Sequence, residues 1–174
     1  WREEKYEEFC HAAAHNSLFN SLASEPELGS PSRGGLPGTT ATPKDGGYVV
    51  RGRKTWSTGG RHLTHLLVRV ALGDEPAVVL IRQGSPGLSW LETWSDSLSL
   101  RASDSHDALF EDVWIPADHI VEQGTVKKSH SIWFPLIMSS IYLGAALAAR
   151  HSVICFALER VPTALGKPIA TLPK

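Results

Sequence analysis

The pattern of apolar and polar positions divides the 174-residue chain into a helical beginning, a β-rich middle and an apolar helical end. At the beginning, Tyr6, Phe9, Cys10 and Ala13 recur at helical spacing and form one apolar face. Glutamates crowd the first half of this segment, where they favour the positive N-terminus of a helix. We therefore predict a helix over residues 1–18.

The middle of the chain, from Tyr48 to Pro116, consists of short runs rich in Val, Leu, Ile and Trp that turn residues separate. Such runs are typical of strands, which we expect at residues 66–72, 77–82, 88–94 and 108–115. Strands at close spacing without helices between them indicate an antiparallel barrel or sandwich. With helices on both sides, the fold class is predicted to be α+β.

The end of the chain contains an uncharged segment, residues 131–149, with many small residues. Its length would allow a membrane span, but Pro135, Ser139 and Ser140 interrupt it and the rest of the chain has a polar character. We expect no membrane association. The segment instead predicts a helix that is buried all round in a bundle or subunit interface and continues to Arg160.

Two stretches have turn and loop composition. Residues 19–43 are rich in Gly, Ser, Pro and Thr and are predicted to form a loop, although their glycines match neither the dinucleotide fingerprint nor the P-loop. Residues 45–60 begin with Asp-Gly-Gly, which predicts a hairpin, and end in Trp56-Ser57-Thr58 before two glycines. An open strand end with an indole and two hydroxyls suits a flat, hydrogen-bonding ligand, and a surface hairpin with a core Trp is the alternative.

The charge, the cysteines and the first residues of the chain limit the functions and locations that we expect. The chain is 20% charged with a formal net charge of -1, so it lacks the basic excess of a nucleic-acid binder. Cys10 and Cys155 lie far apart without metal-ligand spacing, and we expect two buried thiols in a reducing compartment, no disulfide and no metal. The chain begins at Trp1 with charged residues, which is unlike a secretory signal. A cytoplasmic location is expected.

Several residues imitate functional motifs. The pair His11 and His15 lacks the glutamate of a metalloprotease helix and a third ligand, so solvated or packing histidines are expected. His62 and His65 would fall on opposite faces of a strand. The stretch 104–107 reads Asp-Ser-His-Asp, but adjacency in sequence is no evidence for a catalytic triad, and a turn between strands is predicted.

Four segments in order resemble the acyl-CoA dehydrogenase family of flavoproteins and together span nearly the whole chain. They are Ser24-Glu25-Pro26 with Gly29-Ser30, the stretch from Gly46 through Lys54-Thr55-Trp56-Ser57-Thr58, Arg101-Ala102-Ser103 with Phe110-Glu111-Asp112-Val113, and Glu159-Arg160 with Gly166-Lys167-Pro168. The resemblance implies that residues 1–18 end an N-terminal helical domain, 19–121 form the middle β domain and 122–174 begin a C-terminal helical bundle. It also implies FAD between the last two domains and a homo-oligomer, a dimer or a tetramer.

The resemblance assigns roles to individual residues. Ala23 and Ser24 would touch the flavin, Trp56 would stack near its ring, and Ser57 and Thr58 would bond its polar edge. Ser30 would line the channel for the acyl-CoA thioester. Arg160 would reach the FAD pyrophosphate, a task for which a guanidinium fork is suited.

The implied reaction removes an α-proton from an acyl-CoA thioester while hydride passes to the flavin. No catalytic base is predicted within the chain, because the family's usual glutamate would lie beyond Lys174. Pro135 replaces an arginine of the family, and Pro31 stands where many members have Asp. Two alternatives stay open: a flavin-dependent monooxygenase of the same fold, or a non-catalytic binding or oligomerisation module. The redox partner and the acyl chain are not predicted.

Overall fold

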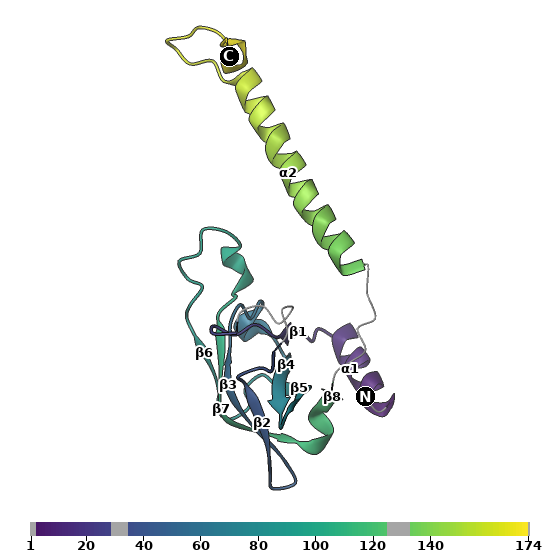
Figure 1. Ribbon diagram of the computed structural model, residues 1–174. Coiled ribbons are helices and arrows are strands. Elements are labelled where there is room, and N and C mark those ends of the chain that lie inside the picture. Colours follow the sequence, from purple (N-terminus) through teal and green to yellow (C-terminus); the bar gives the residue numbers. More distant parts are fainter. Residues whose placement is uncertain (1–2, 29–34, 125–132, 174) are drawn as a thin grey trace. The chain divides into compact units, whose positions relative to one another are not determined.

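The computed structural model describes residues 3–28, 35–124 and 133–173, and the chain divides into two compact units. The first unit, Trp1–Val126, contains α1 and all the described strands (Figure 1). The second unit, Lys127–Lys174, contains α2 and a short 3-10 turn. Each unit is described by itself.

The first unit is built around one mixed sheet. After α1 (Glu3–Ala14), the strands are β1 (Phe19–Leu22), β2 (Thr40–Lys44), β3 (Gly47–Lys54), β4 (His65–Leu72), β5 (Glu75–Arg82), β6 (Leu88–Leu91), β7 (Asp107–Pro116) and β8 (Ile120–Gln123). They lie in the order β6-β7-β3-β2-β4-β5-β8, and β1 pairs with β4 outside this path. The α+β class is confirmed. Most pairings are antiparallel, but β1–β4 and β2–β4 are parallel, and the sheet is open rather than a closed barrel.

The core lies on one face of the longest hairpin, β4–β5. Along β4, Leu66, Val68 and Val70 are fully buried and alternate with half-buried residues, as a strand with one face on a core requires. Phe110 and Val113 of β7 belong to the same cluster. Full burial of each such side chain contributes about 1.5–3 kcal/mol. The predicted strands at 66–72, 77–82 and 108–115 are therefore confirmed, and the strand predicted at 88–94 is shorter because β6 ends at Leu91.

The prediction of a loop over residues 19–43 is wrong at both ends. β1 occupies Phe19–Leu22 and β2 begins at Thr40. Both are short, and β2 exposes every side chain except that of Ala41, so neither shows the apolar alternation by which strands are recognised. Their place is set by backbone pairing with β3 and β4, which no local pattern reveals.

Helix α1 ends at Ala14, four residues before the predicted end. Asn16 adopts a left-handed φ of 69°, and the amides of His15 and Ser17 both bond to the carbonyl of Ala12, which closes the helix. Phe9 anchors α1 to the sheet by edge contacts with Phe19 and His65. The expectation that Cys10 is buried is wrong, since this thiol is exposed, and Cys155 is only half-buried. Both cysteines are free.

Two pairs of histidines were considered in the sequence, and the structure places them differently. His11 and His15 are exposed, and their rings stack with centroids 4.0 Å apart, as solvated histidines on one helix face can do. The expectation that His62 lies on a strand is wrong, because Gly60–His62 form a 3-10 turn before β4. The described residues contain no group of three or more metal-ligating side chains.

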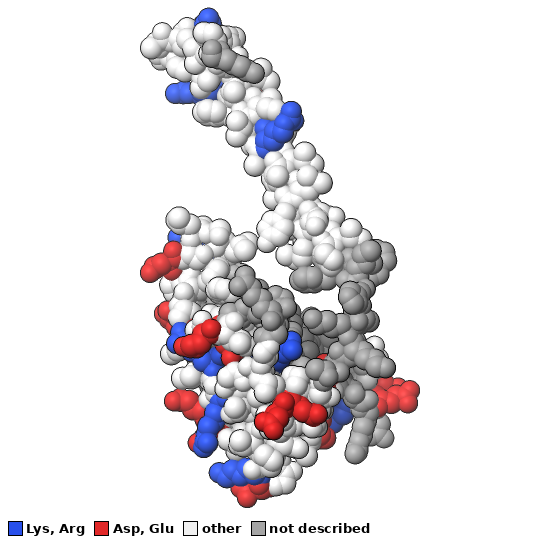
Figure 2. All heavy atoms as spheres, in the orientation of Figure 1, with Lys and Arg blue, Asp and Glu red and all other residues white. Residues whose placement is uncertain are grey.

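The second unit consists of α2 (Trp133–Glu159) and a 3-10 turn, Ile169–Thr171. In this unit large apolar side chains are exposed along the length of α2, among them Ile141, Leu147 and Phe156. Figure 2 shows the second unit as an almost uncharged surface with a few basic groups. The segment Pro135–Glu159 is long and apolar enough to cross a membrane by length and composition alone, which is weak evidence. That α2 is buried in a bundle or a subunit interface stays a prediction.

Candidate functional site

A tight turn directly after β3 presents an exposed indole. Trp56 has a left-handed φ of 55° and is 59% exposed, so it is not a core residue. The amide of Thr58 donates to the carbonyl of Trp56 at 2.9 Å, and the amide of Gly60 donates to the carbonyl of Ser57 at 2.8 Å. The Trp56–Gly60 turn therefore holds a flat apolar face in the open, beside the exposed Thr58.

A second loop, Ser103–His106, holds this turn in place. Each of its four residues forms one hydrogen bond to the turn or to Arg61, which follows it. The carbonyl of Ser103 accepts from Gly59 N at 2.8 Å, Asp104 Oδ2 from Arg61 N at 3.1 Å, the hydroxyl of Ser105 bonds to that of Thr58 at 2.9 Å, and the carbonyl of His106 accepts from Ser57 N at 3.1 Å. Two segments more than 40 residues apart are thus joined at four points.

The 103–106 loop is itself fixed by His106, which is 7% exposed. Its Nδ1 accepts from the backbone amides of Thr93 and Trp94 at 3.1 and 3.2 Å. In the neutral ring the proton therefore sits on Nε2, which faces Asp104 Oδ1 at 3.1 Å. This tautomer follows from the hydrogen-bond partners and ties the loop to the segment after β6.

The turn and the loop approach so closely at Gly60 that no side chain fits there. Gly60 has a left-handed φ of 41°, and an added Cβ would overlap the carboxylate and the carbonyl oxygen of Asp104. Glycine is thus required at this position for space as well as for backbone conformation.

The strand end that leads into the turn is fixed by Asp107, whose side chain is buried. Its Oδ2 accepts from the Arg53 guanidinium at 2.6 and 2.7 Å, and its Oδ1 accepts from the hydroxyls of Thr55 and Thr93 at 2.8 and 2.9 Å. Both carboxylate oxygens are therefore satisfied by hydrogen bonds from three side chains on two segments, which is what a buried carboxylate needs.

The stretch after β1 lies beside the same strand end. The amide of Thr55 donates to the carbonyl of Ser24 at 3.0 Å. Next to it, the fully buried Lys54 bonds Glu25 at 2.6 Å and approaches the carbonyl of Ala23 at 3.5 Å. Glu25 also accepts hydrogen bonds from Gly38 N and from the amide and hydroxyl of Thr39. This buried ion pair holds Ala23 and Ser24 next to the Trp56–Gly60 turn.

Burial and ion pairing shift the pKa values of Glu25 and Lys54 in opposite directions. Burial alone would raise the pKa of Glu25, but hydrogen bonds from Lys54, Thr39 and Gly38 lower it below its ordinary value of 4.5. Burial lowers the pKa of Lys54, and the neighbouring Glu25 carboxylate opposes this shift. The pair is therefore a charged, fully hydrogen-bonded link between β3 and the stretch that follows β1.

The structure gathers five of the seven residues predicted to contact a ligand. Ala23 and Ser24 are half-buried and lie beside the strand end from which the exposed Trp56 and Thr58 project. Ser57 is fully buried, and its hydroxyl has no hydrogen-bond partner among the described residues. Ser30 lies outside the described residues. Arg160 is exposed in the second unit, so nothing places it with the others.

Sequence reasoning missed the residues that support the turn. Residues 104–107 were predicted to form a turn between strands, but 104–106 are irregular and Asp107 is the first residue of β7. In the structure Asp104, Ser105, His106 and Asp107 each bond to the segment 53–61. The density of hydrogen-bonding side chains between two apolar strands was the available signal.

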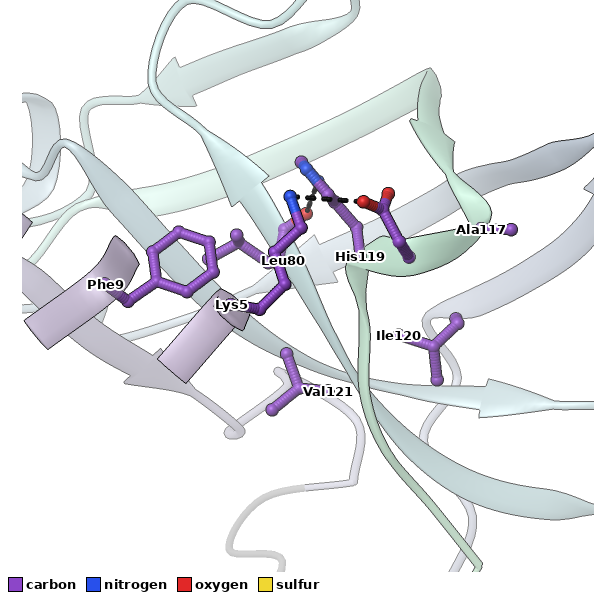
Figure 3. Close-up of a pocket in the computed structure, with 8 residues that line it drawn as sticks. Lys5, Phe9, Leu80, Ala117, His119, Ile120 and Val121 are labelled. Carbon is purple, nitrogen blue, oxygen red and sulfur yellow. Dashed lines mark hydrogen bonds and ion pairs between the residues drawn. The ribbon is translucent and has the colours of Figure 1, made fainter. Parts of the chain in front are cut away.

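A separate cavity of approximately 320 Å³ lies between α1 and the end of the sheet (Figure 3). Its apolar lining includes Phe9, Leu80 and Ile120. Its polar groups are already paired: Lys5 bonds Asp118 at 3.1 Å, and the His119 Nδ1 bonds the Leu80 carbonyl at 2.9 Å. Because none of its lining residues belongs to the predicted ligand contacts, we do not count this cavity as part of the site.

Comparison with known proteins places the site in a recognised domain. Residues 21–113, more than half of the chain, match the family model described as "Acyl-CoA dehydrogenase, middle domain". This range contains the Trp56–Gly60 turn, the 103–106 loop and the Glu25–Lys54 pair.

The curated relatives include, by name, both acyl-CoA dehydrogenases and an N-hydroxylase. The chain is 38% identical over 177 residues to "Putative acyl-CoA dehydrogenase YdbM" of Bacillus subtilis, an alignment that covers 99% of this chain and 46% of the relative. It is 32% identical over 132 residues to isobutylamine N-hydroxylase of Streptomyces viridifaciens, covering 68% of this chain and 34% of the relative. The chain thus spans less than half the length of these relatives.

The solved structures that are similar to this chain also include both a dehydrogenase and a protein of another name. A glutaryl-CoA dehydrogenase from Mycobacterium smegmatis in complex with FADH2 is 25% identical, with a TM-score of 0.72 over 99% of this chain and 44% of that one. The KijD3 protein in complex with FMN and a dTDP-amino sugar is also 25% identical, with a TM-score of 0.63 over 85% of this chain and 38% of that one.

Proposed function

Because the chain belongs to the acyl-CoA dehydrogenase family, we propose that the protein carrying it is an FAD-dependent oxidoreductase that dehydrogenates an acyl-CoA thioester. The observation that carries this proposal is the Trp56–Gly60 turn, which displays an open indole face and an exposed hydroxyl within the family's middle domain. FAD would supply the hydride acceptor. The residues of this chain would bind and orient the ring.

The described residues fit a flavin. The indole of Trp56 offers a face for stacking on a planar ring, which contributes about 0.5–1.5 kcal/mol beyond the area that it buries. Ser24 and Thr58 lie on either side of the strand end and offer hydroxyls to a polar edge. The buried hydroxyl of Ser57 has no described partner, so a ligand or a small rearrangement of the turn would satisfy it. Arg160 would contact the pyrophosphate, and Ser30 the thioester.

The networks behind the turn explain why such a site would be ready for its ligand. Asp107 and the 103–106 loop hold the turn through hydrogen bonds whose partners are already in place. A ring that binds to a fixed indole loses less free energy in ordering the protein than one that must organise a loop.

Assembly and location belong to the same proposal. We infer a homo-oligomer in which the apolar surface of α2 is covered by other helices, because large apolar side chains are exposed along its length. The two free cysteines agree with a cytoplasmic protein.

A flavin-dependent monooxygenase is the second candidate. Isobutylamine N-hydroxylase and an L-evernosamine nitrososynthase of Micromonospora are 32% and 29% identical to the chain. This reaction needs no base for an α-proton, and it would use the same indole turn to bind its flavin.

Anaerobic reduction distinguishes the two candidates. The protein that carries this chain is loaded with FAD and mixed with acyl-CoA thioesters of increasing chain length while the flavin absorbance is followed. A dehydrogenase bleaches with at least one thioester. A flavin that binds but bleaches with none of them, and that NADH or a flavin reductase reduces, would contradict dehydrogenation and favour the monooxygenase.

A further inference from the structure

A chain of three hydroxyls begins at the exposed Thr58 and leads into the protein. Thr58 Oγ1 lies 2.9 Å from Ser105 Oγ, which lies 2.7 Å from Ser103 Oγ. Ser105 is 4% exposed. It is therefore the buried middle member of the chain.

The backbone on both sides of this chain is fixed. The Thr58 carbonyl accepts from Asn20 Nδ2 of β1 at 2.7 Å, and the Ser103 carbonyl accepts from Gly59 N at 2.8 Å. Thr58 is thus held from β1 on one side and from the 103–106 loop on the other. The remaining freedom of the chain is the rotation of its hydroxyl protons.

Each hydroxyl carries one proton and two lone pairs, so the chain can run in two directions. If Ser103 donates to Ser105 and Ser105 to Thr58, the Thr58 proton is free to be donated to a ligand. If Thr58 donates to Ser105 and Ser105 to Ser103, Thr58 offers a lone pair to a donor. In both directions the hydrogen bonds polarise one another and strengthen the contact that Thr58 makes.

We propose that Ser105 is a positioning residue that acts through Thr58, and that the reversible chain adapts Thr58 to a flavin in both of its redox states. This inference rests on the proposed function. Reduction would give the flavin an additional N–H, so the ring nitrogen that carries it would change from acceptor to donor. A hydroxyl that can reverse its role keeps its hydrogen bond through that change.

A double-mutant cycle on flavin affinity tests the proposal. Thr58→Val, Ser105→Ala and the double variant are made in the protein that carries this chain. FAD affinity is then measured by fluorescence titration, in air and, with the flavin reduced, under anaerobic conditions. We expect each single variant to bind about fivefold more weakly, the scale of one hydrogen bond. The double variant should bind no more weakly than Thr58→Val, because Ser105 has no effect without its partner.

Two further variants separate positioning from folding. Ser105→Thr keeps the hydroxyl and should retain most of the wild-type affinity. Ser97→Ala removes an exposed hydroxyl that bonds only the Ser99 carbonyl among the described partners, and it should leave affinity unchanged.

The inference is overturned if Ser105→Ala weakens binding by the same factor in the Thr58→Val background, or if it has no effect in the wild type. It is also overturned if the loss is confined to one redox state, since a reversible chain serves both. A wild type that takes up no flavin would overturn the proposed function and this inference together, whereas flavin uptake with additive variants overturns the inference alone.

Discussion

Trp56 combines two features that cost free energy unless the surrounding structure stabilises them: a left-handed backbone and a large exposed ring. A bulky residue with positive φ costs on the order of 1–3 kcal/mol and persists only where its surroundings enforce it. Here the 103–106 loop holds the three residues that follow Trp56, through hydrogen bonds to Ser57, Thr58 and Gly59. The sequence left open a ligand-facing indole or a core Trp, and the exposure of Trp56 excludes the core Trp.

Replacing Trp56 tests its role directly. We expect Trp56→Ala to weaken FAD binding about fivefold to tenfold, because stacking contributes about 0.5–1.5 kcal/mol beyond area burial. The matched control is Trp114→Ala, which removes an indole of β7 that is 49% exposed and should leave the affinity unchanged. Equal effects from both substitutions, measured by fluorescence titration, would contradict a stacking role for Trp56.

Gly60 allows a second test at the same scale. Gly60→Ala should weaken flavin binding and lower the midpoint of thermal unfolding, because its Cβ would overlap Asp104 and force the turn away from the 103–106 loop. Gly73→Ala is the control, since Gly73 also has a left-handed φ but open space around it. That variant should show only the backbone strain, about 1 kcal/mol. Indistinguishable variants would mean that the close approach does not matter.

At the scale of elements, the ion pair Glu25–Lys54 joins the stretch after β1 to the end of β3. Removing one partner of a buried pair costs about 3–5 kcal/mol, because the other charge is left without compensation. We expect Glu25→Gln to destabilise the protein by about this amount in urea unfolding at neutral pH. Glu25→Gln/Lys54→Met, which leaves no buried charge, should recover part of the loss. A double variant less stable than Glu25→Gln would contradict this account.

The same pair predicts a pH dependence. The pKa of Glu25 in the folded protein lies below its ordinary value of 4.5 because of the hydrogen bonds that it accepts. Its ionised form therefore stabilises the fold above about that pH, and this contribution is lost as the pH falls through the lowered pKa. The difference in unfolding free energy between wild type and Glu25→Gln should be constant above about pH 5 and shrink below pH 4.5. If the difference in unfolding free energy instead grew as the pH falls, this prediction would be wrong.

Strands with a clear pattern of apolar residues could be predicted from the sequence, and strands without one could not. β4, β5 and β7 carry apolar alternation or β-rich runs and were found within two residues. β1, β2 and β8 are four or five residues long, and long-range pairing defines them. The residues predicted to contact a ligand come from motifs in register, whereas the supporting residues Ser105 and His106 depend on contacts more than 40 residues apart. The sequence shows a dense run of hydrogen-bonding side chains at 104–107, but it does not show which distant residues they contact.

At the scale of the whole molecule, the described residues do not show what packs against the apolar surface of α2. Its apolar side chains point to all sides, which suits a helix within an assembly. We predict that the 174-residue chain by itself self-associates in sedimentation velocity, and that Ile141→Lys reduces the association. Arg150→Lys, on the same helix, should not. Flotation with lipid vesicles instead of self-association would contradict the expectation that no membrane is involved.

The central claim, that the Trp56–Gly60 turn is built to hold a flavin, is tested most directly by an FAD titration of the purified protein that carries this chain. We predict a yellow protein, or an apoprotein that takes up one FAD per chain with saturation and with quenching of tryptophan fluorescence. A colourless protein whose absorbance and fluorescence do not change at any FAD concentration would contradict the account.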